Sequence, residues 1–108
     1  MISTKLPASS VAIENDNIDL TCASDGWPKA EITWYKGDVQ LLDDGSKYAI
    51  QKSDETLRNG CMRMKSVLTL LGVKRDAAGR YTCKAKNIVN SAESSTDLVV
   101  RCKYISAV

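Results

Sequence analysis

The chain has 108 residues, of which 44% are hydrophobic and 26% charged, with a formal net charge of +2 and no histidine. This length corresponds to one domain with a modest core, and the small net charge argues against nucleic acid or an anionic membrane surface as the main partner. The lack of histidine excludes Ser-His-Asp and Cys-His catalytic sites, and no apolar run reaches the roughly 18 residues of a membrane span, so we expect no membrane insertion.

Short alternating segments separated by turn signals occupy the first half of the chain. We expect strands over 11–13, 18–22, 31–35, 39–42 and 47–51. The first of these follows Pro7, which should break an edge strand into two pieces. Alternation places Leu20 and Cys22 on one inner face and Trp34 on another.

The second half of the chain continues the same pattern. Strands are expected over 63–71, 80–86 and 92–102, with a single helical turn over 74–78 and a tight turn at Asn59-Gly60. The segment between Tyr48 and Leu68, which includes the polar residues 53–60, is expected to contain an unusually long loop. These elements predict an all-β sandwich over 1–103, with a C-terminal tail or linker over 104–108.

Several motifs together resemble the I-set of the immunoglobulin superfamily over residues 7–102. They are Gly26-x-Pro28, Ile32-x-Trp34-x-Lys36, Leu68-Thr69-Leu70-x-x-Val73 and Ala78-Gly79-x-Tyr81-x-Cys83-x-Ala85-x-Asn87. The resemblance implies a two-sheet antiparallel sandwich with Greek-key connections.

The resemblance also implies which residues form the centre of the core. Cys22 and Cys83 should form a disulfide between the sheets, with the Trp34 indole packed over it. Closing a loop of about 60 residues stabilises by about 4 kcal/mol on the chain-entropy model. Tyr81 should bond backbone near the preceding turn, and Leu20 and Leu70 should complete the core.

Cys61 and Cys102 have no place in the disulfide that the resemblance implies. The first should lie near the start of the fifth strand and the second at the far end of the seventh, about 20 Å away. A disulfide needs Cα atoms within about 7 Å, so we predict that these two do not bond each other. Three interpretations stay open: reduced thiols with Cys102 against the core and Cys61 in a loop, bonds to another domain or chain, or a second bridge made by a bent loop.

Three surfaces are candidates for protein contact. Trp27 is expected at a loop tip, where it either anchors a partner or packs on its own loop or a preceding domain. Tyr35, Lys84 and Lys86 should point outward from one sheet, as a contact face or a solvated one. Val67 and Leu71 should point outward from the other sheet, as a contact or as tolerated strand formers.

Other kinds of site have weaker support. The four cysteines lie far apart, so no zinc site, other metal or cofactor is expected. The carboxylate pairs at 43–44 and 54–55 are interpreted as solvated loop charge rather than catalytic acids, and the chain is not expected to be an enzyme. Basic residues are numerous in the middle of the chain, but they fall on different loops and faces, which disfavours a heparin-like polymer as the partner. They are Arg58, Arg63, Lys65, Lys74, Arg75 and Arg80.

The resemblance implies a protein-interaction module with homophilic or heterophilic partners. It would serve for recognition and as a spacer among neighbouring immunoglobulin domains of an extracellular adhesion or receptor protein. The alternative is a load-bearing domain of an intracellular muscle or cytoskeletal protein. A disulfide suits the first setting, whereas spare thiols and the lack of an Asn-x-Ser/Thr glycosylation site suit the second.

Overall fold

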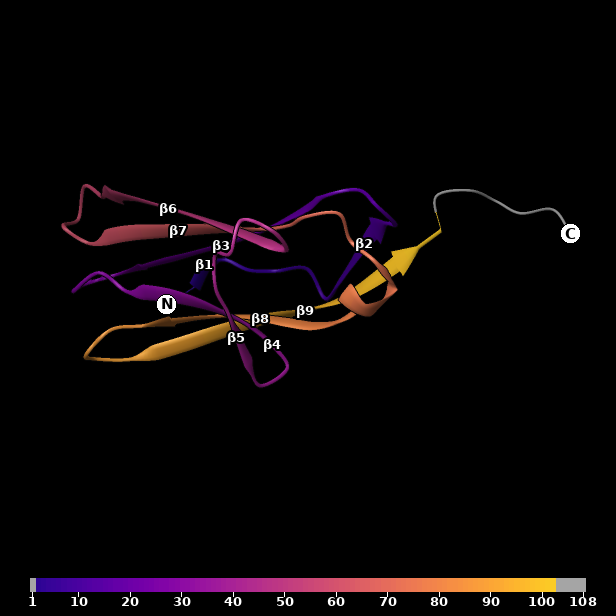
Figure 1. Ribbon diagram of the computed structural model, residues 1–108. Helices are drawn as coiled ribbons and strands as arrows, with labels where there is room; N and C mark the ends of the chain where they lie inside the picture. Colours follow the sequence, from indigo (N-terminus) through magenta and orange to yellow (C-terminus); the bar gives the residue numbers. More distant parts are fainter. Residues whose placement is uncertain (1, 103–108) are drawn as a thin grey trace, which may run out of the picture.

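The computed structural model describes residues 2–102 (Figure 1). Two β-sheets, one of four strands and one of five, lie face to face. The two-sheet sandwich expected from the motifs is therefore confirmed. The tail expected over 104–108 lies outside the described residues.

The strands follow the expected order, and the edge strand is in two pieces, one on either side of Pro7. The four-stranded sheet contains, in spatial order, β1 (Ile2–Thr4), β3 (Ile18–Gly26), β7 (Met62–Leu70) and β6 (Tyr48–Thr56). The five-stranded sheet contains β2 (Ser9–Ile13), β9 (Ser91–Arg101), β8 (Gly79–Lys86), β4 (Glu31–Lys36) and β5 (Val39–Leu41). A short 3₁₀ helix, η1 (Arg75–Ala77), is the helical turn predicted before β8.

The chain changes sheet near Pro7, as the proline predicts. β1 pairs antiparallel with β3, whereas β2 pairs in parallel with β9 from Ser9 opposite Asp97 to Ile13 opposite Arg101. Between the two strands, the Leu6 N–H donates to Ser94 Oγ at 2.9 Å. Within residues 2–102 the sandwich is therefore antiparallel except for this ladder.

The long loop expected in the segment between Tyr48 and Leu68 is wrong. β6 continues to Thr56 and stays in register with β7, so that Thr56 lies opposite Met62. Residues 51–56 are all exposed and polar, and they show no apolar alternation. Backbone ladder bonds form without buried side chains, so the hydrophobic pattern could not indicate this extension.

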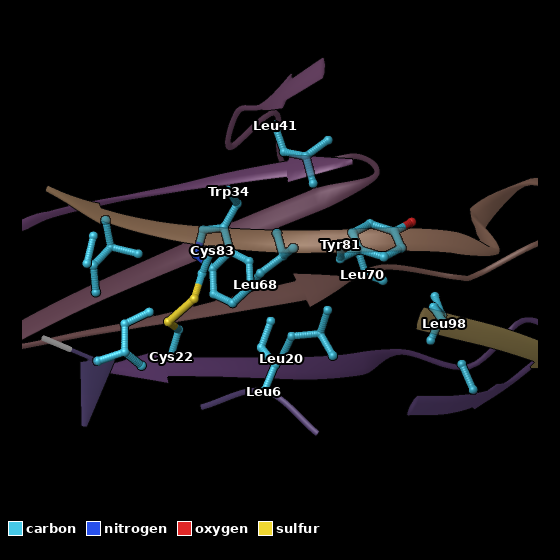
Figure 2. Packing of buried hydrophobic residues seen from close by; sticks show 14 of the residues in the cluster. Leu6, Leu20, Cys22, Trp34, Leu41, Leu68, Leu70, Tyr81, Cys83 and Leu98 are labelled. Atoms are coloured by element: carbon cyan, nitrogen blue, oxygen red, sulfur yellow. A yellow bond between two sulfur atoms is a disulfide. The ribbon is translucent and has the colours of Figure 1, made fainter. Parts of the chain in front are cut away.

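The core lies between the sheets and is built from the inner faces of the central strands (Figure 2). Leu68 and Tyr81 are fully buried, and Trp34 is 1% exposed. The Trp34 indole N–H donates to the buried Ser66 Oγ at 2.9 Å, so its single donor is paired inside the core. Leu20 and Leu70 also belong to this cluster.

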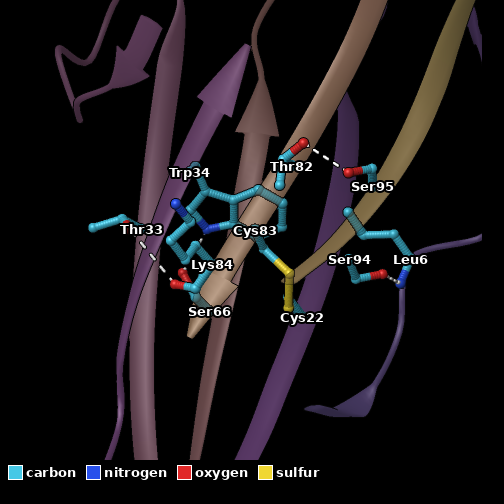
Figure 3. The surroundings of a disulfide bond; sticks show 10 residues. All are labelled: Leu6, Cys22, Thr33, Trp34, Ser66, Thr82, Cys83, Lys84, Ser94 and Ser95. Atoms are coloured by element: carbon cyan, nitrogen blue, oxygen red, sulfur yellow. Dashed lines mark hydrogen bonds between the residues drawn. A yellow bond between two sulfur atoms is a disulfide. The ribbon is translucent and has the colours of Figure 1, made fainter. Parts of the chain in front are cut away.

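The Cys22–Cys83 disulfide joins β3 to β8, and therefore one sheet to the other (Figure 3). The two Cα atoms are 6.6 Å apart. Trp34 lies directly opposite Cys83 in the ladder between β4 and β8, which places the indole beside the bridge. The pairing implied by the sequence motifs is present.

Candidate protein interaction surface

Three connections lie together at one end of the sandwich. These are the β3–β4 loop, the β6–β7 turn and the β8–β9 turn, all at the left of Figure 1, while β9 runs to the opposite end. Large apolar side chains are exposed on two of them: Trp27 is 66% exposed, Ile88 92% and Val89 73%. We call these three residues the pole patch.

Asn87 holds the two loops of the pole patch together. Its Nδ2 donates to the Pro28 carbonyl at 2.7 Å, across from the β8–β9 turn to the β3–β4 loop. Its Oδ1 accepts the backbone N–H groups of Val89 at 2.9 Å and Asn90 at 2.8 Å. A single side chain therefore shapes one turn and ties it to the other loop.

Trp27 is 66% exposed, so packing on its own loop covers only about a third of its side chain. Most of the indole is therefore open to contact with a partner or with a preceding domain. Sequence reasoning missed Ile88 and Val89. The available signal was a pair of branched apolar residues between Asn87 and Asn90, where turn residues are usually polar.

The outward face of β4 and β8 adjoins the pole patch. Lys84 lies with its Nζ 5.5 Å from the Tyr35 ring centroid, a cation–π contact. Lys86 is exposed two residues closer to the turn, on the same face of β8. An open groove of about 660 Å³ runs along this face to Pro28 and Ile88. The structure thus connects Tyr35, Lys84 and Lys86 with one end of the pole patch.

Val67 and Leu71 form no comparable surface. Val67 is half-buried in the middle of its sheet, between Thr21 and Gln51 of the neighbouring strands. Leu71 follows the last residue of β7, is half-buried, and donates its N–H to the Lys47 carbonyl at 2.9 Å. These positions offer little apolar area beside that of the pole patch.

The basic residues of the middle of the chain are scattered, and several have partners. Arg63 makes two bonds to the Asp25 carboxylate, Nε at 2.8 Å and Nη2 at 2.9 Å, and these bonds lower the pKa of Asp25. Arg80 lies 3.6 Å from Asp97, its partner in the ladder between β8 and β9. Lys74 donates to Asn15 Oδ1. Arg63, Arg80 and Lys74 therefore lie on different elements and do not form one basic stripe.

The two spare cysteines are both unbonded. Cys61 is half-buried at the β6–β7 turn, and Cys102 follows β9, at the opposite end of the sandwich (Figure 1). The interpretation that Cys102 packs against the core is wrong, because its side chain is exposed and its Sγ lies 3.6 Å from Arg75 Nη2. β9 ends one residue earlier, so the alternation that pointed Cys102 inward stops at Arg101.

Clusters of metal-ligating side chains and membrane-spanning helices are both absent from the described part of the chain. No cluster of three or more His, Cys, Asp or Glu side chains within residues 2–102 is placed to hold a metal ion. The same range contains no helix of the length and apolar character needed to cross a bilayer.

Known proteins share both the sequence pattern and the fold. Mouse peroxidasin homolog is 32% identical over 98 residues, which covers 91% of this chain and 6% of that protein. Mouse vascular endothelial growth factor receptor 2 is 30% identical over 93% of this chain and 6% of its own length. Mouse hemicentin-1 is 32% identical over 87% of this chain and 2% of its own. The chain therefore spans only a few per cent of these relatives.

Solved structures share the same fold. A structure described as Titin-A168169 has a TM-score of 0.79 and 25% identity, and the match covers 94% of this chain and 48% of that one. The Immunoglobulin I-set domain family matches residues 2–100. The chain belongs to the immunoglobulin I-set domain family.

Proposed function

We propose that this chain is a non-enzymatic protein-interaction module of an extracellular adhesion or receptor protein. It serves for recognition and as a spacer between neighbouring immunoglobulin domains. The observation that carries the proposal is the pole patch, formed by Trp27, Ile88 and Val89 on two loops that Asn87 joins. Exposed aromatic and aliphatic side chains on a preorganised surface are typical anchors of protein interfaces.

The relatives support the setting. The chain matches only 2–6% of proteins such as mouse hemicentin-1 and mouse vascular endothelial growth factor receptor 2, the second of which is a receptor by name. Such small shares support the presence of further domains beside it. The Cys22–Cys83 disulfide supports an oxidising compartment.

Binding assays on the parent protein test the proposal. Beads coated with the parent protein are mixed with each other and with cells that display it, and adhesion is counted for the wild type and for Ile88→Asp. A charge at a hot-spot position costs about 2 kcal/mol or more, so adhesion affinity should fall about thirtyfold.

Leu42→Asp is the matched control. Leu42 is 66% exposed, as Trp27 is, but it follows β5 and belongs to none of the three connections at the pole. Adhesion that survives Ile88→Asp, or that falls equally with Leu42→Asp, would contradict a role for the pole patch.

The parallel ladder between β2 and β9 favours a second candidate function. β1 begins at the end where the pole patch lies, and β9 finishes at the other (Figure 1). Tension along the chain would therefore shear the ladder from Ser9 opposite Asp97 to Ile13 opposite Arg101. A load-bearing domain of an intracellular muscle or cytoskeletal protein would use this geometry.

A free-thiol count on the parent protein from its own tissue separates the two functions. Two alkylated cysteines, with Cys22 and Cys83 bonded, would support the extracellular module. Four alkylated cysteines would favour the load-bearing domain, because a reducing cytosol keeps thiols free.

A further inference from the structure

The β6–β7 turn presents an acceptor-like tripeptide at the surface. The Gly60 N–H bonds the Leu57 carbonyl at 3.0 Å, and the Leu57 N–H bonds the Cys61 carbonyl at 2.8 Å, so the turn is closed by its own backbone. Asn59 lies at the tip and is exposed. Gly60 has a φ of 88°, which glycine adopts without strain.

The next residues have the chemistry that N-glycosylation requires. The transfer needs an asparagine followed, two residues later, by a side chain that can donate and accept a hydrogen bond, commonly Ser or Thr. A cysteine thiol is a weaker group of the same kind. Asn59-Gly60-Cys61 has this spacing, and the Cys61 N–H donates to Asn59 Oδ1 at 3.0 Å, which holds the two residues in one turn.

Cys61 can serve as the hydrogen-bonding residue two positions after Asn59 only while it is a free thiol. It is unbonded, and the other free cysteine, Cys102, lies at the opposite end of the sandwich (Figure 1). Cys22 and Cys83 bond each other in the core. Folding within one domain therefore leaves the thiol of Cys61 available.

We propose that Asn59 is an N-glycosylation site, which rests on the extracellular setting proposed above. The donor is an oligosaccharide linked to a polyprenyl diphosphate. A bond forms between Asn59 Nδ2 and C1 of the first sugar, the bond from C1 to the diphosphate oxygen breaks, and the lipid diphosphate leaves while the transferase takes one amide proton. The glycan then projects from the same end of the domain as the pole patch.

The chain secreted from mammalian cells behind an added signal peptide tests this. Intact mass should show a glycoform that a peptide amidase removes, and deglycosylation in ¹⁸O water should convert Asn59 into labelled Asp. A parallel incubation in ¹⁸O water without the amidase measures spontaneous deamidation, to which Asn-Gly is prone and which takes up the same label.

Three variants assign the site. Asn59→Gln and Cys61→Ala should lose the glycoform completely, and Cys61→Thr should raise its fraction severalfold. Asn90→Gln is the matched control, because Asn90 is also exposed in a turn but has Ala92 two residues later. It should leave the glycoform unchanged.

The outcomes separate this site from the proposed function. If the Cys61→Thr chain were glycosylated and the wild type were not, the proposal would be overturned. That result would mean that the transferase can reach the turn but that the Cys61 thiol does not support the transfer. No glycan on either chain would also overturn it. Four free thiols in the tissue protein would instead contradict the extracellular function, whereas the secreted wild type would still report on the site.

Discussion

The indole N–H of Trp34 shows how one polar pair is accommodated in the core. It donates to Ser66 Oγ at 2.9 Å, and both side chains are buried. In Ser66→Ala the indole donor would lose this partner, so we expect the free energy of unfolding to fall by about 1–3 kcal/mol. Urea titration with an unchanged slope measures this.

Ser53→Ala is the control for that substitution, since Ser53 is exposed on β6. It should change the unfolding free energy by about 0.5 kcal/mol or less. Equal effects of the two variants would mean that the indole bond contributes nothing beyond the loss of a hydroxyl.

The buried Tyr81 hydroxyl should make the stability of the fold depend on pH in the alkaline range. Its hydroxyl donates to the Ala77 carbonyl at 2.6 Å, and burial, with smaller contributions from Tyr48 and Asp76, raises its pKa. A raised folded-state pKa means that the unfolded chain loses this proton first, so stability should decline as the pH rises above about 10. Tyr81→Phe should lower stability by about 1 kcal/mol at pH 7 and flatten this decline.

Unfolding midpoints at pH 7 and at several values above pH 10 test the effect of Tyr81. Tyr35→Phe serves for comparison, because Tyr35 is half-buried on the outer face of β4. An identical alkaline decline in wild type and Tyr81→Phe would contradict the assignment.

At the scale of elements, the ion pair between Arg63 and Asp25 joins the start of β7 to the end of β3. The two residues lie opposite each other in the ladder, and Arg63 lowers the pKa of Asp25. A folded-state pKa below the unfolded one contributes stability that is present above about pH 4 and is lost as the pH falls through the folded value.

Arg63→Gln should therefore reduce the free energy of unfolding at pH 7 only slightly, since both side chains are partly exposed and solvent screens the pair. The difference from wild type should shrink as the pH falls below about 4 and Asp25 becomes protonated. Arg80→Gln, which removes a more exposed and longer pair with Asp97, should have a smaller effect at pH 7. A gap between wild type and Arg63→Gln that persists unchanged at pH 2 would argue against the ion pair.

At the scale of the whole molecule, one bond links the two sheets covalently. Cys22 and Cys83 are 61 positions apart, so their disulfide closes most of the chain into a loop. The double variant Cys22→Ala/Cys83→Ala should lose about 4 kcal/mol of unfolding free energy. Cys102→Ser should stay within about 0.5 kcal/mol of the wild type, because Cys102 is exposed. Chemical denaturation of the three proteins under oxidising conditions makes the comparison.

Local sequence pattern was enough to predict the sandwich and its centre. Inner faces follow from alternation with a period of two, which is a local property, and alternation therefore places Leu20, Trp34 and Leu70 in the core. The disulfide followed from the motifs around Cys22 and Cys83. These features depend on short-range pattern and on a core arrangement that the family shares.

The position of the pole patch depends on tertiary structure instead. Ile88 and Trp27 are far apart in sequence, and their loops meet because β3, β4, β8 and β9 all turn at one end of the sandwich. The extension of β6 to Thr56 depends on pairing with β7 rather than on apolar side chains. Exposure of Cys102 depends on where β9 ends. Long-range pairing and loop placement have no local signature, so alternation alone could not predict them.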